Sequence, residues 1–230
     1  MRYSLLLFLL INFYFINAQI NVHAVSGSTL GAPIGPIKEG DEGSLQGGPS
    51  FGLGISYKVK NYLAFHYELK LSNKKGAYDA YTQGDTVYAF EIPNQPPALF
   101  PTTFEGRVKG AFNNAYVDMP FYASFKFKRM RTNIGFYHAI LIDGSHEGNV
   151  DLTLGENFSQ INDEFDDSEF IAPYDFGLLL GGEFYVYPER MSIGMNATYG
   201  ITSIFKKEYP NIEGHFGNLY AHLFFRMVLY

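Results

Sequence analysis

The feature that most constrains the fold of this chain is an alternation of large apolar and small or polar residues with a period of two. Between Leu63 and Leu71 every second residue is large and apolar, and the residues between them are Ala64, His66, Glu68 and Lys70. Because successive side chains of a β-strand point to opposite sides, such a segment needs an apolar environment on one face and a polar one on the other. A water-soluble barrel directs the apolar face inward, whereas a membrane barrel directs it outward to lipid.

The alternation, together with the turn residues that interrupt it, predicts eight strands. They span residues 19–27, 50–59, 62–72, 115–128, 131–143, 174–187, 191–203 and 218–230. Tight turns are expected at residues 60–61, 129–130 and 188–190, and the connections between them are long, above all residues 73–114 and 144–173. Strict alternation of short and long connections is typical of membrane barrels. We therefore predict an all-β, eight-stranded antiparallel up-and-down transmembrane β-barrel with short periplasmic turns and long outer loops.

The residues of the polar face favour the membrane interpretation. This face is rich in Gly, Ser, Ala and Thr, which suits the narrow interior of an eight-stranded barrel. Its few charges are expected to pair inside the lumen, because an isolated buried charge is costly to desolvate. The expected lumenal network consists of His66, Glu68, Lys70, Asp118, Lys126, Glu183 and Arg226. The alternative is a soluble exported β-barrel that binds a small apolar ligand in an interior lined by the large apolar face.

The first residues predict export. Arg2 precedes an apolar run over residues 5–16, and the small residue Ala18 follows, which is the pattern of a secretory signal peptide. The run is too short to span a membrane as a helix. With residues 1–18 as the signal peptide, residues 19–230 form one domain, expected in the outer membrane. The absence of cysteine excludes disulfides and thiol chemistry, and the net charge of -6 argues against nucleic acid as a partner.

Two segments resemble strands of the PorT-like outer-membrane barrels of Bacteroidota. The run Tyr116-Val117-Asp118-Met119-Pro120-Phe121, followed by Lys126, is similar to the family's Y-x-E-x-P-hydrophobic…K strand, with Asp118 in place of the more usual Glu. The segment Asp175-Phe176-Gly177, followed by Gly181-Gly182-Glu183-Phe184, is similar to its D-x-G…G-x-G strand, with two contiguous glycines. The matching motif positions are Tyr116, Asp118, Pro120, Asp175, Gly177 and Gly181. The resemblance covers about residues 110–230 and implies an outer-membrane barrel, with a subunit of the type IX protein secretion apparatus as the alternative.

No segment predicts an enzyme. Asp143, Ser145 and His146 lie close in sequence to Asp167 and Ser168, but nearness in sequence does not place a base within reach of a nucleophile. We therefore expect no catalytic residues and no cofactor. The paired lumenal charges, in turn, predict a closed lumen.

The long outer loops are the expected functional elements. The loop over residues 144–173 is acidic, and Asp163, Asp166 and Asp167 are its candidate calcium ligands, although a solvated acidic loop is the favoured interpretation and no metal site is predicted. The expected partners are outer-membrane lipid, lipopolysaccharide and an envelope protein contacted by the outer loops.

Overall fold

The computed structural model describes residues 19–34, 42–90, 98–154, 160–206 and 217–230, and within these ranges it contains nine strands and one short 3-10 helix. The elements are β1 (Gln19–Ile34), β2 (Glu42–Lys60), β3 (Leu63–Phe90), β4 (Ala98–Phe127), β5 (Met130–Leu154), β6 (Gln160–Asp166), η1 (Ser168–Phe170), β7 (Tyr174–Tyr187), β8 (Met191–Gly200) and β9 (Gly217–Val228). The residues of the expected signal peptide lie outside the described ranges. No helix among the described residues is long and apolar enough to span a membrane.

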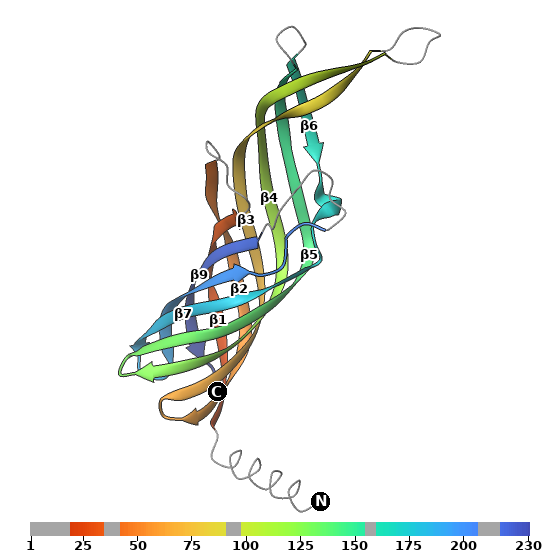
Figure 1. The fold of residues 1–230 in the computed structure, drawn as a ribbon. Coiled ribbons are helices and arrows are strands. Elements are labelled where there is room, and N and C mark those ends of the chain that lie inside the picture. Colours follow the sequence, from red (N-terminus) through yellow and green to blue (C-terminus); the bar gives the residue numbers. More distant parts are fainter. Residues whose placement is uncertain (1–18, 35–41, 91–97, 155–159, 207–216) are drawn as a thin grey trace, which may run out of the picture.

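Eight of these strands close into an antiparallel ring. Neighbours follow the order β1-β2-β3-β4-β5-β7-β8-β9, and β9 pairs back with β1 from His23↔Val228 to Ile34↔Gly217. β6 lies outside the ring and pairs with the outer part of β5. The strands wind steeply around the lower half of the molecule (Figure 1). The structure thus confirms the predicted fold class.

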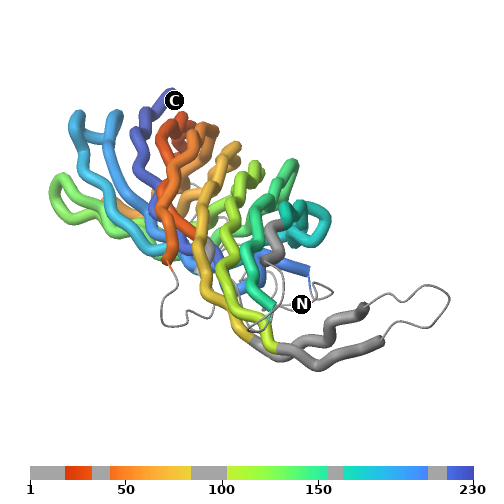
Figure 2. Tube along the Cα trace, turned by 90° about the horizontal axis from the view of Figure 1, so that it is seen from above, coloured from red at the N-terminus to blue at the C-terminus, as the bar shows by residue number. Residues whose placement is uncertain are grey.

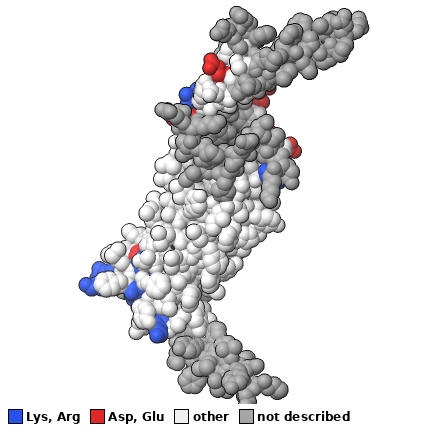
Figure 3. All heavy atoms as spheres, in the orientation of Figure 1, with Lys and Arg blue, Asp and Glu red and all other residues white. Residues whose placement is uncertain are grey.

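The large apolar side chains point away from the lumen. Leu53, Leu178 and Leu223, which lie on three different strands, are 57%, 56% and 50% exposed. Figure 3 shows the surface that such residues form as a broad uncharged band, with Lys and Arg gathered at its lower end. The inward positions are mostly polar and buried, as at Glu68 and Asn196. This polarity is that of a membrane barrel, so the alternative of a soluble barrel with an apolar ligand in its interior is wrong.

The longest predicted loops are instead largely strands. Residues 73–90 and 98–114 continue the β3–β4 ladder from Asn73↔Ala115 to Phe90↔Ala98, and β5 and β6 add two more strands beside it. We call this sheet, formed by β6 and by the parts of β3, β4 and β5 beyond the apolar band, the extension. It rises above the ring in Figure 1 and lies to one side of the molecule when seen from above (Figure 2).

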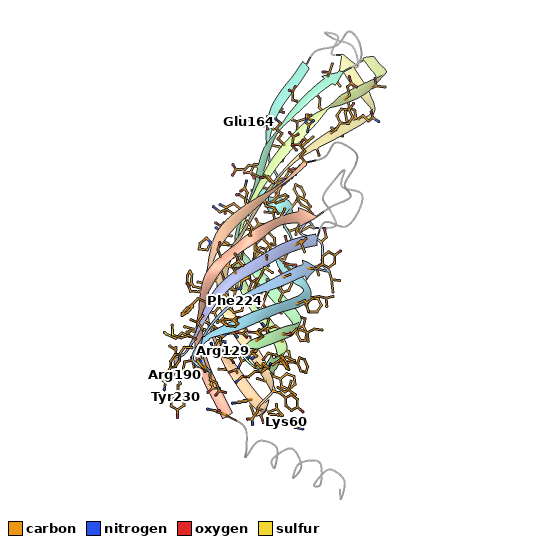
Figure 4. All side chains as sticks on the ribbon, turned by 90° about the vertical axis from the view of Figure 1, so that its left-hand side faces the viewer. Lys60, Arg129, Glu164, Arg190, Phe224 and Tyr230 are labelled. Atoms are coloured by element: carbon orange, nitrogen blue, oxygen red, sulfur yellow. The ribbon has the colours of Figure 1, made fainter. Side chains whose placement is uncertain are left out.

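The predicted tight turns all lie at the end of the ring opposite the extension. They cover residues 61–62, 128–129 and 188–190. Lys128 and Glu189 have φ values of 55° and 61°, in the left-handed region that tight turns of this kind require. Figure 4 shows Lys60, Arg129, Arg190 and Tyr230 at this short-turn end and Glu164 on the extension.

Candidate functional site

The lumen contains a buried cluster centred on Arg226 of β9, which we call the arginine cluster. Arg226 Nη1 donates to both carboxylate oxygens of Glu183 on β7, at 2.6 and 2.7 Å, and Nη2 donates to Glu68 Oε1 on β3 at 2.7 Å. The Tyr122 hydroxyl donates to the same Glu68 oxygen at 2.6 Å and also contacts Arg226. One guanidinium therefore links two carboxylates from different sides of the ring.

Glycines leave the space that these long side chains occupy. A Cβ atom at Gly194 would lie 2.7 Å from the Cβ of Glu183, and a Cβ atom at Gly54 would lie 2.8 Å from the Cγ of Glu68. Both distances are shorter than real Cβ contacts. The glycine-rich inward face thus provides room for a few large charged groups.

A second buried cluster surrounds Lys74 of β3, and we call it the lysine cluster. Lys74 Nζ lies 3.2 Å from Asp118 Oδ1 of β4 and 3.1 Å from Asp175 Oδ2 of β7. It also lies 4.6 Å and 4.7 Å from the ring centroids of Tyr116 and Tyr137. The ammonium group is therefore held by two carboxylates and two aromatic rings, and it is nearly inaccessible to solvent.

The carboxylates of the lysine cluster have further hydrogen-bond partners. Asp175 accepts from the Tyr137 hydroxyl at 3.0 Å and from Asn218 Nδ2 at 2.8 Å. Asp118 accepts from Ser72 Oγ at 2.5 Å. A buried ion pair is stable only if such bonds satisfy its remaining lone pairs, and here several do.

Lys70 lies between the two clusters, opposite Asp118 in the β3–β4 ladder. Its Nζ lies 3.7 Å from Glu68 Oε2 and 3.3 Å from His222 Nδ1. The four cations Lys70, Lys74, Arg131 and Arg226 face the four anions Glu68, Asp118, Asp175 and Glu183. Leaving the histidines aside, the formal charges of these eight residues sum to zero. The cavity beside the lysine cluster has a volume of only about 20 Å³, which is enough for about one water molecule.

Of the residues expected in the lumenal network, His66 and Lys126 lie apart from its ion pairs. His66 is buried, stacks on Tyr122 with ring centroids 4.8 Å apart, and bonds Ser124 Oγ at 2.7 Å. Lys126 was expected in the lumenal network, but none of the ion pairs of the two clusters includes it. It occupies the last inward position before the turn, where the lumen opens, and pairs with Glu189 at 2.8 Å.

Lys74, a central residue of the site, is not among the residues predicted for the lumenal network, because residues 73–114 are predicted to form a loop. Lys70, Ser72 and Lys74 alternate in the sequence with outward residues, and all three side chains are buried. The continued alternation was therefore the signal that could have placed Lys74 in the lumen.

The motif positions that carry the PorT-like resemblance gather around the lysine cluster. Tyr116, Asp118 and Asp175 all contact Lys74. Pro120 lines the small cavity beside the cluster, and a Cβ atom at Gly177 would lie 2.7 Å from Tyr137 Cε1. A Cβ atom at Gly181 would lie 2.1 Å from Asn196 Oδ1. The motif residues therefore form or make room for buried polar contacts in the lumen.

His146, which lies close in sequence to Asp143 and Ser145, is part of an aromatic cluster at the base of the extension. His146 stacks on Phe112, with ring centroids 4.2 Å apart, and its Nε2 lies 3.1 Å from the Tyr78 hydroxyl. Phe165 and Phe205 complete the cluster. Burial lowers the pKa of His146 to about 4 and raises that of Tyr78 to about 12, so both are uncharged at neutral pH.

The candidate calcium ligands Asp163, Asp166 and Asp167 do not form a metal-binding group. Asp166 accepts hydrogen bonds from the backbone N–H and the hydroxyl of Ser168, and Asp163 lies opposite Val150 in the β5–β6 ladder. Among the described residues, no group of three or more His, Cys, Asp or Glu side chains could hold a metal ion.

Comparison with known proteins gives a family match. The family model described as "Outer membrane protein beta-barrel domain" matches residues 11–206. Among solved structures, Neisserial surface protein A (NspA) is 13% identical, with 92% of this chain and 98% of that chain covered and a TM-score of 0.35. The attachment invasion locus protein Ail of Yersinia pestis is 11% identical, with 89% and 98% covered and a TM-score of 0.34. The outer membrane protease OmpT from Escherichia coli is 8% identical, with 92% and 96% covered and a TM-score of 0.30. A search of curated proteins gives no match.

Proposed function

Since the chain belongs to the outer membrane protein beta-barrel domain family, we propose that it is a non-enzymatic outer-membrane protein with a closed lumen, which acts through its extension. The family places it in the outer membrane. The observation that supports a closed lumen is the pair of ion clusters, which together with Lys70 and Arg131 have no net formal charge and whose members come from β3, β4, β5, β7 and β9 and meet across the ring. Among the described residues, groups held in this way leave no charged side chain of the two clusters free to line a water-filled path through this part of the lumen.

The orientation in the membrane follows from the connections. In barrels of this class the short turns face the periplasm and the longer connections face outward. The turns at residues 61–62, 128–129 and 188–190 are then periplasmic, and the extension projects from the cell surface. The apolar band contacts lipid, and the base of the extension lies at the level of lipopolysaccharide.

The extension is suited to a protein partner in the envelope or at the cell surface. It is a sheet rather than a flexible loop, and among the described strands β6 has a neighbour on one side, so its other edge is free to pair. Exposed charges of both signs lie on it, among them Arg107, Lys109 and Glu164.

A PorT-like membership is the finer form of this proposal. It is supported by the way Tyr116, Asp118 and Asp175 surround Lys74. A role as a subunit of the type IX secretion apparatus is the second candidate. A secretion defect after deletion of the gene, restored by the intact protein, separates this role from that of a free-standing surface protein.

The experiment that tests the closed lumen is a conductance measurement on the purified protein in a planar lipid bilayer. We expect no ion current from the unaltered barrel at moderate voltage. Replacing both Glu183 and Arg226 by Gly removes the arginine cluster and should produce measurable current if the barrel still folds, which boiled and unboiled samples in SDS would show. Steady conductance by the unaltered protein would contradict the proposal.

A further inference from the structure

The lumen opens at the short-turn end into a cavity of about 380 Å³, which we call the vestibule. Its deep part is lined by Arg226, His66 and His23, and its mouth by residues of the turns at 61–62 and 188–190 and by residues of the strands around them. Figure 4 places Lys60, Arg190 and Tyr230 at this end of the ring. The vestibule lies below the ion clusters and is separate from the extension.

The vestibule has an excess of positive charge. Its lining contains six cationic side chains and one carboxylate side chain, that of Glu189: the cations are Lys58, Lys60, Lys126, Arg131, Arg190 and Arg226. Glu68 and Glu183 balance Arg131 and Arg226 from the deep side. At the mouth, however, Lys58 and Lys126 share Glu189, at 3.6 and 2.8 Å. The mouth therefore attracts anions.

Several buried polar atoms of the vestibule residues have no hydrogen-bond partner among the described residues. These are the Tyr185 hydroxyl, Arg226 Nε and the Nδ1 atoms of His23 and His66. Buried polar groups nearly always have a partner, so four unpartnered atoms on residues around one cavity favour a polar occupant, which these side chains would reach by a small shift. Arg226 and Tyr185 in particular offer N–H and O–H donors, as an anion requires.

Two cations of the vestibule, Arg131 and Lys126, lie against one aromatic ring. The Arg131 guanidinium lies 4.7 Å and Lys126 Nζ lies 5.2 Å from the centroid of Tyr185, which is itself buried. Ring contacts of this kind restrict long side chains before a ligand arrives, which lowers the entropic cost of binding. The Glu189 carboxylate is 57% exposed on its turn and can move away from the two lysines.

We propose that the vestibule binds a small solute through an oxyanion group, either a phosphate or a carboxylate. The oxyanion takes the place of the Glu189 carboxylate beside Lys126 and Lys58, and the Arg131 guanidinium and the Tyr185 hydroxyl donate to it. A planar guanidinium and two ammonium groups are the donors that proteins use for both kinds of oxyanion. With the proposed orientation the site faces the periplasm, but binding itself does not depend on the role of the extension.

Isothermal titration calorimetry on the full mature protein, folded in detergent, tests this site. The probes are phenyl phosphate, benzoate and, as an uncharged control, benzyl alcohol, in 0.15 M NaCl, where the attraction of distant charges is largely screened. We expect saturable binding of at least one of the two anions and none of benzyl alcohol. The tighter anion identifies the phosphate or the carboxylate class. Failure of both anions to bind, or equal binding of benzyl alcohol, would overturn the proposal.

Single substitutions locate the binding. Lys126→Gln should weaken binding of the tighter probe about tenfold, the loss expected for one charge-assisted hydrogen bond. Lys128→Gln removes the same charge from the same end but outside the vestibule lining, and should leave the dissociation constant within about twofold, because screening weakens its distant attraction. Glu189→Gln should strengthen binding, since it removes the competing carboxylate.

Tyr185→Phe keeps the ring and should weaken binding through loss of the hydroxyl. Each variant is first checked for heat-dependent mobility in SDS, which reports a folded barrel independently of binding. Equal effects of Lys126→Gln and Lys128→Gln, or no gain in Glu189→Gln, would refute the assigned site. A conducting lumen would contradict the proposed function and leave these results unaffected.

Discussion

At the scale of single residues, the barrel interior depends on side chains whose charges are matched one against another. Lys74 shows this most clearly, because two carboxylates and two tyrosine rings meet at one ammonium group. Its outward neighbour Lys75 has the same chemistry, but none of the lumenal ion pairs includes it. Two adjacent lysines on one strand thus differ only in which face of the sheet they occupy.

This difference predicts unequal effects of the same substitution. Lys74→Met leaves Asp118 and Asp175 buried without their cation, and breaking a buried pair costs about 3–5 kcal/mol. We expect a clearly lower urea midpoint for unfolding of the protein in lipid vesicles, whereas Lys75→Met should change the midpoint little. The double variant Lys74→Met/Asp175→Asn should recover part of the loss, because three lumenal cations then face three anions and Asp118 still lies opposite Lys70 in the β3–β4 ladder. Equal midpoints for the two single variants would show that the lysine cluster does not stabilise the barrel.

At the scale of elements, the aromatic cluster around His146 joins β6 and the segment around Phe205 to β3, β4 and β5. The neutral imidazole stacks on Phe112 and pairs with the Tyr78 hydroxyl, so protonation would place a charge among apolar rings. The pKa of His146 is lowered from 6.5 to about 4 by burial. The unfolded segment therefore binds more protons than the folded one between these values, and the folded form loses stability as pH falls from about 6.5 towards 4.

The measurement is hydrogen exchange of β5 and β6 at pH 7 and at pH 5, after correction for the intrinsic effect of pH on exchange. Opening of this region should increase on the order of tenfold at pH 5. His146→Phe keeps an aromatic ring in the stack but cannot take up a proton, so it should abolish the difference between the two pH values. Exchange in β1 and β9, which do not contribute to the cluster, serves as the internal control. The same pH dependence in His146→Phe would assign the effect to other groups, such as the acidic residues nearby.

The sequence predicted the ring strands well and the extension poorly, for a physical reason. Within the apolar band one face meets lipid and the other a polar lumen, so the alternation at Leu69, Lys70 and Leu71 is sharp. Beyond it both faces of the sheet meet water or polar groups, and the contrast that marks a strand is lost at residues such as Asp79 and Lys109, although they still pair.

The lumenal acids and bases could be predicted from the inward face of each strand. Their partners could not, because the sequence of one strand does not determine which residues lie opposite it across the ring. The rim position of Lys126 and the central position of Lys74 were missed for these reasons.

At the scale of the whole molecule, the structure combines a closed ring with a sheet formed where three of the ring strands continue beyond it (Figure 1). The ring is closed by pairing of β9 with β1 and of β4 with β5 well within the apolar band. The upper β3–β4 hairpin, which comprises residues 79–90 and 98–109, adds pairing to the extension but contributes no residue to the ion pairs of the arginine and lysine clusters. The barrel should therefore be able to fold without it.

Excision of this hairpin tests that separation. Tyr78 and Gly110 lie opposite each other in the ladder, so residues 79–109 can be replaced by Asn-Gly, which forms a two-residue turn between antiparallel strands. We expect the shortened protein to keep its heat-dependent mobility in SDS, with a transition temperature within a few degrees of the intact protein, because every lumenal ion pair remains. Exchange should increase in the outer half of β5, which loses its β4 partner, and stay unchanged in β1 and β9. Loss of the mobility shift would mean instead that ring closure requires the hairpin, and that the extension and barrel form one cooperative unit.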